Sequence, residues 1–409
     1  MQKKNPNSFQ TGTDHQYKCY LYPIGDAVKK LIYLTILIGA ISLFCGCDQS
    51  PAIQPSGNNI KVGVIGPFSG PHFAKGKNGL EGIKTVMTMQ PLLLNGDGVE
   101  LVVEDDKNEP ELTLKALKKL TGKDNVSAII ILSGSGPVME IAPIADIDKT
   151  PILAVLATHP DITTHSSFIS QLCFDDNFQG TVAALFVMDE LLIEKVAVFS
   201  NPENDYSRFL AARFTSKFKS IGGRVTESVA LTNETVDYTG ILENIRSQKP
   251  ELLYLPVRAE DLFQIVKAIE KMDWKPKMLG SDGLLATVLT QHKESSGLLE
   301  GILAIDFSSN RMPLTSFGKK ALKKYRSLYD TPANSYTVMG AEGYALMLNA
   351  LNRCVTPGDR ECINRMIRST IGFSGITGRI TINPDGKAIR PLVVNSIKKG
   401  RQAFIVKVY

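Results

Sequence analysis

From Ile60 onward the chain alternates short apolar runs with longer segments of helical periodicity, and this alternation restricts the fold more than any other feature. A strand buried on both faces is a short apolar run, and its parallel neighbour is reached through a crossover that is usually a helix. The pattern therefore predicts an α/β protein with mainly parallel sheets. We expect strands at Ile60–Ile65, Val99–Glu104, Ala128–Leu132, Ile152–Val155, Lys195–Ser200, Arg224–Ala230, Leu252–Pro256, Lys277–Leu279 and Gly301–Phe307.

The alternation also indicates two lobes. It is interrupted near Leu172–Gly180 and resumes at Lys195, and a chain of 409 residues is too long for one ordinary core. After Gly375 the pattern changes to β runs separated by the turn-forming segment Asn383–Gly386. We therefore expect the chain to end in antiparallel strands.

The first 46 residues have the layout of a secretory signal. Lys29 and Lys30 precede fourteen mostly apolar residues, Leu31–Phe44, which are followed by small residues. A permanent membrane span is the alternative, but it needs about 20 apolar residues and this run is shorter. The sequence therefore predicts export, with residues 1–46 as the leader.

The end of the apolar run resembles a bacterial lipobox, with Gly46 before the cysteine that would be modified, Cys47. Simple cleavage and an uncleaved anchor are the alternatives to lipidation of Cys47. Asp48 resembles the signal that retains lipoproteins at the inner membrane. Residues 47–57, which are rich in Pro, Ser, Gly and Asn, would then form a flexible tether between the membrane and the folded body.

Charge gives no argument for a nucleic-acid partner. The formal net charge is +5, of which residues 1–46 contribute +3, so the remainder carries only +2. Lysines are scattered among glutamates rather than grouped in one basic block, which is typical of an ordinary solvated surface.

Three cysteines remain outside the leader and Cys47, namely Cys173, Cys354 and Cys362. Cys354 and Cys362 flank a turn-rich loop that could bring them together, and an oxidising compartment favours a disulfide. We predict that bridge and a buried free thiol at Cys173. The five histidines show no metal-ligand spacing with these cysteines, so no metal site is expected.

The glycine-rich segment after the first strand does not fit a nucleotide enzyme. Five residues separate Gly70 from Gly76 where a P-loop has four, and Asn78 replaces the Ser or Thr that holds magnesium. The dinucleotide fingerprint and the nucleophile elbow are also missing from the sequence. Asp105 and Asp106 are adjacent on an extended segment and point apart, which favours capping over paired-carboxylate catalysis. We expect no cofactor and no enzymatic activity.

The loop Gly66-Pro-Phe-Ser-Gly70 resembles the opening of the leucine/isoleucine/valine-binding protein family of periplasmic receptors for ABC transport. Other segments follow in the order and approximate spacing of that family: Gly79–Gly82, Val103–Asp106 with Pro110, Ala142–Ala145, Ala157–Asp161, Asp176–Gly180, Asp205–Tyr206, Gly280–Gly283, Gly340–Tyr344 and Gly375–Gly378. Together they cover nearly all of the chain from about Asn59. The resemblance implies a type I periplasmic binding fold, in which two Rossmann-like lobes joined by three crossovers close on a ligand.

On that pattern the first lobe comprises residues 58–176 and 306–378, and the second comprises residues 177–305 and 379–409. The implied function is that of an extracytoplasmic, lipid-anchored substrate-binding protein, which captures an amino acid or a small carboxylate for an ABC permease in the cytoplasmic membrane. A ligand sensor for signalling with the same fold is the alternative. An enzyme in the cleft would need a nucleophile, a metal or an acid–base pair, and the sequence offers none.

The expected ligand residues follow strands, because ligands of open α/β sheets bind beyond the carboxyl ends of the strands. Ser133–Gly136 lies at such a place, where hydroxyls and amides could hold a carboxylate, with simple N-capping as the alternative. The resemblance assigns Ser135 to the ligand carboxylate. It places Leu156 and Thr158 in the segment that holds both the carboxylate and the ammonium of an amino acid.

From the second lobe, the resemblance assigns Tyr206 to cover the ligand and Asp282 to pair with its ammonium. A tyrosine packed on its own lobe and an ordinary turn aspartate are the alternatives. Arg258 and Lys75 depart from the family, whose aliphatic amino-acid binders carry tyrosines in these two loops. If both cations face the cleft rather than solvent, they favour a ligand with an additional acidic group, since a guanidinium recognises a carboxylate by paired hydrogen bonds.

Overall fold

Two mainly parallel sheets organise the part of the chain that the computed structural model describes, which comprises residues 53–232, 234–235, 237–309 and 311–409. The expected leader and the lipidation site at Cys47 lie outside these residues. Residues 53–409 form one compact unit. Within the described ranges, no helix is both long and apolar enough to cross a membrane.

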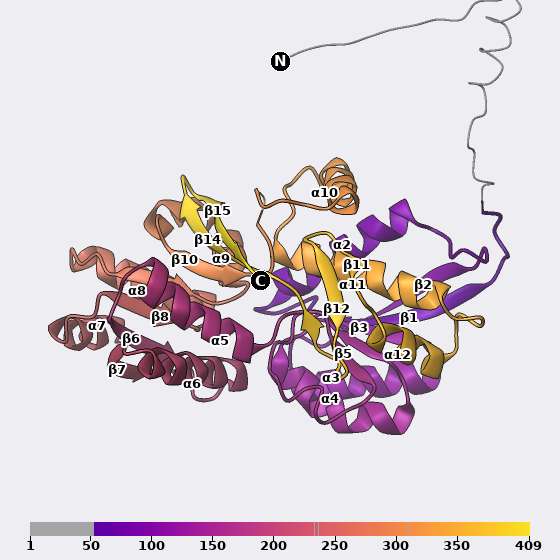
Figure 1. The fold of residues 1–409 in the computed structure, drawn as a ribbon, viewed down its shortest axis with the longest axis horizontal. Coiled ribbons are helices and arrows are strands. Elements are labelled where there is room, and N and C mark those ends of the chain that lie inside the picture. The colour runs from indigo at the N-terminus through magenta and orange to yellow at the C-terminus, as the bar shows by residue number, and fades with distance from the viewer. Residues whose placement is uncertain (1–52, 233, 236, 310) are drawn as a thin grey trace, which may run out of the picture. The chain divides into compact units, whose positions relative to one another are not determined.

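The first sheet has the strand order β2-β1-β3-β4-β5 and is parallel throughout. Helices α2 and α11 pack on one face of this sheet, and α3 and α4 cover the other (Figure 1). The elements of this first lobe are β1 (Asn59–Gly66), α2 (Phe73–Met89), β2 (Gly98–Asp105), α3 (Pro110–Lys118), the π-helix η1 (Lys119–Lys123), β3 (Ala128–Ile131), α4 (Ser135–Asp148), β4 (Ile152–Ala154), β5 (Ile169–Gln171) and α11 (Ser335–Asn352).

The second sheet has the order β15-β14-β10-β9-β8-β6-β7, with α5 and α6 on one face and α7, α8 and α9 on the other. Its last two strands run antiparallel, as predicted for the tail. The elements of this second lobe are α5 (Asp176–Leu185), η2 (Phe186–Glu190), β6 (Lys195–Ser200), α6 (Asp205–Ser220), β7 (Arg224–Ala230), α7 (Tyr238–Ser247), β8 (Leu252–Leu255), α8 (Ala259–Lys271), β9 (Lys277–Gly280), α9 (Leu284–Gln291), η3 (Lys293–Leu299), β10 (Leu303–Asp306), β14 (Leu392–Lys398) and β15 (Arg401–Val408).

The chain passes between the two sheets three times, after β5, after β10 and before β14. Two Rossmann-like lobes with three crossovers are therefore confirmed. The segments outside the two sheets are α10 (Ser316–Tyr329), α12 (Arg360–Arg368) and a small antiparallel sheet of β11 (Phe373–Ser374), β12 (Arg379–Ile382) and β13 (Ala388–Ile389). The lobe boundaries remain a prediction. Since β12 pairs with both β11 and β13, the third crossover lies nearer to residue 390 than to residue 379.

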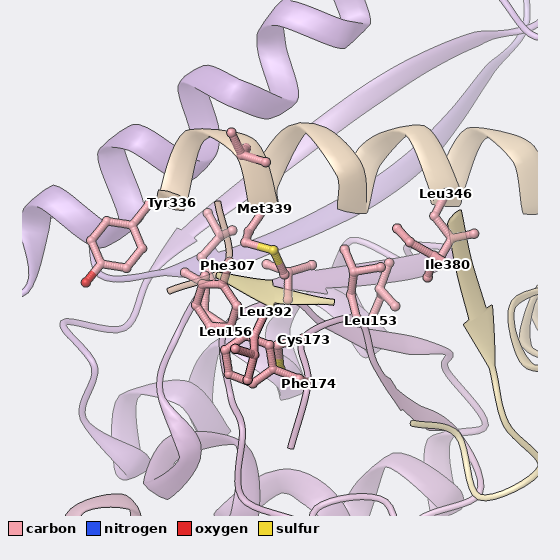
Figure 2. Packing of buried hydrophobic residues seen from close by; sticks show 14 of the residues in the cluster. Leu153, Leu156, Cys173, Phe174, Phe307, Tyr336, Met339, Leu346, Ile380 and Leu392 are labelled. Carbon is pink, nitrogen blue, oxygen red and sulfur yellow. The ribbon is translucent and has the colours of Figure 1, made fainter. Parts of the chain in front are cut away.

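An apolar cluster packs under α11 and connects the sheets with the crossovers. Figure 2 shows Met339 and Leu346 of α11 above Leu153, Phe174 and Phe307, all of them almost fully buried. Burying side chains of this size stabilises the fold by about 1.5–3 kcal/mol each. This cluster fixes the loops that follow β4 and β10.

A buried ion pair ties α11 to the third crossover. The carboxylate of Glu342 lies 2.8 Å from the guanidinium of Arg390, and both side chains are fully buried. Oε1 of Glu342 also accepts hydrogen bonds from the backbone N–H groups of Ile376 and Thr377, and Arg390 donates to the carbonyl of Leu172. A carboxylate so placed is stabilised only while its partners remain.

Cysteine pairing links the end of α11 to the first turn of α12. Cys354 and Cys362 form a disulfide with a Cα–Cα distance of 5.9 Å. Cys173 is a buried free thiol, and its Sγ lies 2.9 Å from the carbonyl oxygen of Ala157.

Candidate functional site

Ser135 and Thr158 are joined in the first lobe. Ser135 begins α4 directly after β3, and its Oγ accepts hydrogen bonds from the backbone N–H groups of Thr158 at 3.2 Å and His159 at 3.1 Å. Oγ1 of the buried Thr158 has no partner that meets hydrogen-bond geometry among the described residues, although it lies close enough to Asp176 to lower the pKa of that carboxyl, against the larger effect of burial. A buried hydroxyl without a partner costs free energy, so this atom is available to a ligand.

Leu156 contributes differently from its neighbours. Its side chain is only 4% exposed and packs in the core near Phe174 and Phe307 (Figure 2). A contact between Leu156 and a ligand would therefore come from its backbone.

A hydrogen-bond network joins α5, α6 and the loop between β9 and α9 in the second lobe. Oδ1 of Asp282 accepts from the hydroxyl of Tyr206 at 2.5 Å and from Nε2 of Gln179 at 2.7 Å, and the backbone N–H of Asp282 donates to Oε1 of Gln179. Nε2 of Gln179 also lies 3.1 Å from Oδ1 of Asp176 in the first turn of α5. The network fixes the orientation of Asp282 and Tyr206.

This network brings two buried carboxyl groups close together. Burial raises the pKa of Asp282, and burial together with the nearby carboxylate of Asp282 raises the pKa of Asp176 well above its usual range. Oδ2 of Asp176 and the hydroxyl of Tyr254 on β8 have no hydrogen-bond partner within the described ranges. An entering cation would stabilise both carboxylates, because an opposite charge favours their ionised form.

Lys75 faces the same network from the first turn of α2. Burial lowers the pKa of Lys75, and the carboxylates of Asp282 and Asp106 oppose that effect. The Lys75 ammonium makes no hydrogen bond or ion pair with any residue that the structure describes. Burial, followed by the charge of Lys75, lowers the pKa of His72 to about 4, so His72 is neutral at pH 7.

Arg258 is held by its own helix. It is the N-cap residue of α8, and its Nε and Nη2 atoms lie 2.8 Å and 2.7 Å from the carboxylate oxygens of Asp261. Asp261 is fully buried and also accepts a hydrogen bond from the hydroxyl of Tyr238. Two of the guanidinium donors are therefore already used, and recognition of a ligand by Arg258 stays a prediction.

The two lobes touch without a ligand. The hydroxyl of Tyr336 in α11 donates to the carbonyl of Gly283 at 2.9 Å and lies 2.7 Å from Oγ1 of Thr287 in α9. The rings of His159 and Phe209 lie 4.7 Å apart. These contacts join the two lobes directly through side chains of both.

Sequence reasoning gave no role to Gln179 or Asp176, although both belong to the segment Asp176–Gly180 used for the resemblance. Residues three apart on a helix share a face, and this spacing at the start of α5 was the available signal.

The described ranges contain no group of three or more His, Cys, Asp or Glu side chains that could hold a metal ion.

Asp306 should make stability depend on pH at the second crossover. It is fully buried, and it accepts hydrogen bonds from the N–H of Phe307 at 2.8 Å and from Gln402 at 3.2 Å. Burial raises its pKa to about 7. Because the folded state holds this proton more tightly than the unfolded state, the stabilisation is full below about pH 4 and is lost as the pH rises through about 7.

We therefore expect Asp306→Asn, which mimics the protonated carboxyl, to gain stability relative to the wild type as the pH rises. The gain should be at most about 1.4 kcal/mol per pH unit between about pH 4 and about pH 7. Denaturant titrations of both proteins across this range measure it. A difference in unfolding free energy that does not vary with pH would contradict the expectation.

Comparison with known proteins places this architecture among binding proteins. A sequence model for the family described as periplasmic binding protein matches residues 59–402. A protein named Leu/Ile/Val-binding protein homolog 6 from Brucella abortus is 25% identical over 349 residues, which cover 81% of this chain and 85% of the relative. A protein named amino acid binding protein from Pseudomonas aeruginosa is 23% identical over 307 residues, which cover 73% and 79%.

The solved structures include a similar protein. The crystal structure of the leucine binding protein LivK from Thermotoga maritima superposes with a TM-score of 0.79 and 29% sequence identity. The match covers 85% of this chain and 98% of that protein.

Proposed function

This chain belongs to the periplasmic binding protein family, and we propose that it is an extracytoplasmic receptor of an ABC transporter that closes on an amino acid with an additional acidic or polar group. The observation that carries the proposal is that opposite charges face each other across the cleft. The acidic network of Asp282 and Asp176 lies on the second lobe, and the unpaired ammonium of Lys75 approaches it from the first.

Each charged group of an amino acid would have a partner in this cleft. The α-ammonium would lie between the carboxylates of Asp282 and Asp176 and replace the water lost on burial. The α-carboxylate would meet the start of α4, where the free N–H dipoles, Ser135 and the unpartnered hydroxyl of Thr158 favour an anion. Lys75 would then bind a second anionic or polar group, because a charge-assisted hydrogen bond compensates its burial.

The proposed mechanism is closure rather than chemistry. Ligand contacts from both lobes add to the contact of Tyr336 with Gly283 and so stabilise the closed form. A permease that recognises the closed form would then accept the ligand. A lipid at Cys47 and the tether of residues 47–57 would keep the receptor at the membrane.

The relatives support the amino-acid class, and two of the three names refer to aliphatic amino acids, whereas the polar atoms of this site argue against an aliphatic side chain. Their names refer to amino acids in general, to leucine, isoleucine and valine, or to leucine. In this chain the buried atoms without a partner near the network belong to Thr158, Asp176 and Tyr254, all of them polar, and the Lys75 ammonium is close to the same carboxylates. A purely apolar ligand side chain next to these atoms would leave them unsatisfied.

The proposal is tested by calorimetric titration with aspartate, glutamate, asparagine, glutamine, leucine and succinate. We expect an acidic amino acid to bind best, and Lys75→Met to weaken its binding by roughly tenfold or more while changing leucine binding little. Preferential binding of leucine would contradict the acidic side group. Mass analysis of the recovered ligand is the control for chemical turnover, which would contradict a binding-only function.

A further inference from the structure

A second hollow, with a volume of about 1790 Å³, lies between α2, α9, α10 and the β14–β15 turn. None of the residues proposed above for the ligand lines it. Its walls come from both lobes, with α2 and α10 on one side and α9 and the β14–β15 turn on the other. We call it the basic groove.

The groove is lined by eight exposed cationic side chains: Lys77, Lys293, Arg311, Lys323, Arg326, Lys398, Lys399 and Arg401. These eight make no ion pair with any carboxylate among the described residues. The groove has one acidic lining residue in that part of the chain, Glu81, which accepts a hydrogen bond from the hydroxyl of Tyr325. Eight unpaired cations around one hollow create a local positive potential that the net charge does not reveal.

The fold holds several of these cations in fixed places. Lys399 and Gly400 have φ values of 52° and 66°, the left-handed conformation that a two-residue hairpin turn requires. Lys398 and Arg401 face each other across this hairpin, and the N–H of Lys399 donates to the carboxylate of Glu300. The turn is thereby held beside η3.

Helix α10 contributes to the opposite wall. Lys323 and Arg326 are three residues apart and so lie on one face of the helix. Keeping like charges together on a surface costs stability unless a partner of opposite charge compensates for it. The arrangement is therefore more typical of a surface that binds an acidic partner than of charges that only keep a protein in solution.

We propose that the basic groove is a docking site for an acidic segment of a partner protein. A flat anionic membrane would meet protruding residues, whereas a hollow of this volume accepts an inserted chain. Acidic side chains entering it would form ion pairs on both walls. Since the walls belong to different lobes, the docked segment would hold the lobes in one arrangement.

The test uses a fluorescein-labelled oligoglutamate peptide and fluorescence anisotropy with the full folded body. We expect binding that weakens as salt rises, because exposed charges are screened. The double variant Lys323→Glu/Arg326→Glu should reduce the affinity by about tenfold or more, since it reverses two charges on one wall.

The matched control is Lys115→Glu/Lys118→Glu on α3, which has the same spacing, exposure and charge change away from the groove. Its peptide affinity should match that of the wild type. If the glutamate variant of α10 fails to melt cooperatively, Lys323→Gln/Arg326→Gln replaces it. The proposal would be overturned if both double variants lost the same affinity or if the peptide did not bind at all. Binding to phosphatidylglycerol vesicles in place of the peptide would overturn it as well.

Discussion

Asp282→Asn is expected to weaken amino-acid binding by roughly 10- to 100-fold, because it removes the charge that would face the ligand ammonium. The substitution keeps the size of the side chain and an oxygen that can still accept from Tyr206. The change should therefore act on affinity more than on the fold. Titration calorimetry with the best ligand of the panel measures the loss.

A matched control uses an aspartate that is exposed and remote from the network. Asp273 is 93% exposed, and Asp273→Asn should leave the affinity unchanged. Succinate supplies a second control, since a ligand without an ammonium should lose little affinity to Asp282→Asn. Undiminished amino-acid binding by Asp282→Asn would remove Asp282 from the site.

Glu342→Leu is expected to lower the free energy of unfolding by about 3–5 kcal/mol, because it leaves Arg390 charged, buried and without its counterion. The backbone N–H groups of Ile376 and Thr377 would lose their acceptor as well. Urea titration followed by circular dichroism measures the loss. The double variant Glu342→Leu/Arg390→Met should lose less than the two single variants together, because it leaves no unpaired charge.

The chain offers a control pair with nearly the same separation and opposite burial. Nζ of Lys149 lies 2.9 Å from the carboxylate of Glu361, and both side chains are more than 60% exposed. Glu361→Ala should change the unfolding free energy by about 1 kcal/mol or less. A loss at Glu342 no larger than the loss at Glu361 would contradict the argument from burial.

Most of the fold was predictable because buried parallel strands leave a simple signal. All nine predicted strands are present, with ends within two residues of those expected. Among the strands of the parallel sheet, β5 was not predicted, because it contains only Ile169, Ser170 and Gln171 and so short a segment has no periodicity to detect. It pairs with β4, and its Ile169 packs into the apolar cluster on the α3–α4 face of the sheet.

The candidate site was predictable only in part. The resemblance placed Ser135 and Thr158 together, and Asp282 with Tyr206, and the structure joins each pair within one lobe. The link through Gln179 depends on the position of α5 next to the loop that follows β9, which no local pattern specifies. The pairing of Arg258 with Asp261 did have a local signal, since the two residues are three apart at the start of a helix.

The basic groove shows why charge patterns along the chain can mislead. Lys77, Lys293, Lys323 and Lys398 are far apart in sequence, and each is an ordinary surface lysine in its own segment. Only the crossovers bring α2, α10 and the β14–β15 turn to one hollow. The distribution of lysines along the sequence therefore did not predict a concentrated positive potential.

The hydrogen bonds of Tyr336 also affect how strongly closure of the two lobes would depend on a bound ligand. They join the lobes through protein atoms alone, so part of the closing energy is present before any ligand arrives. The strength of this tyrosine contact would thus set how much of the attraction between the lobes a bound ligand has to supply.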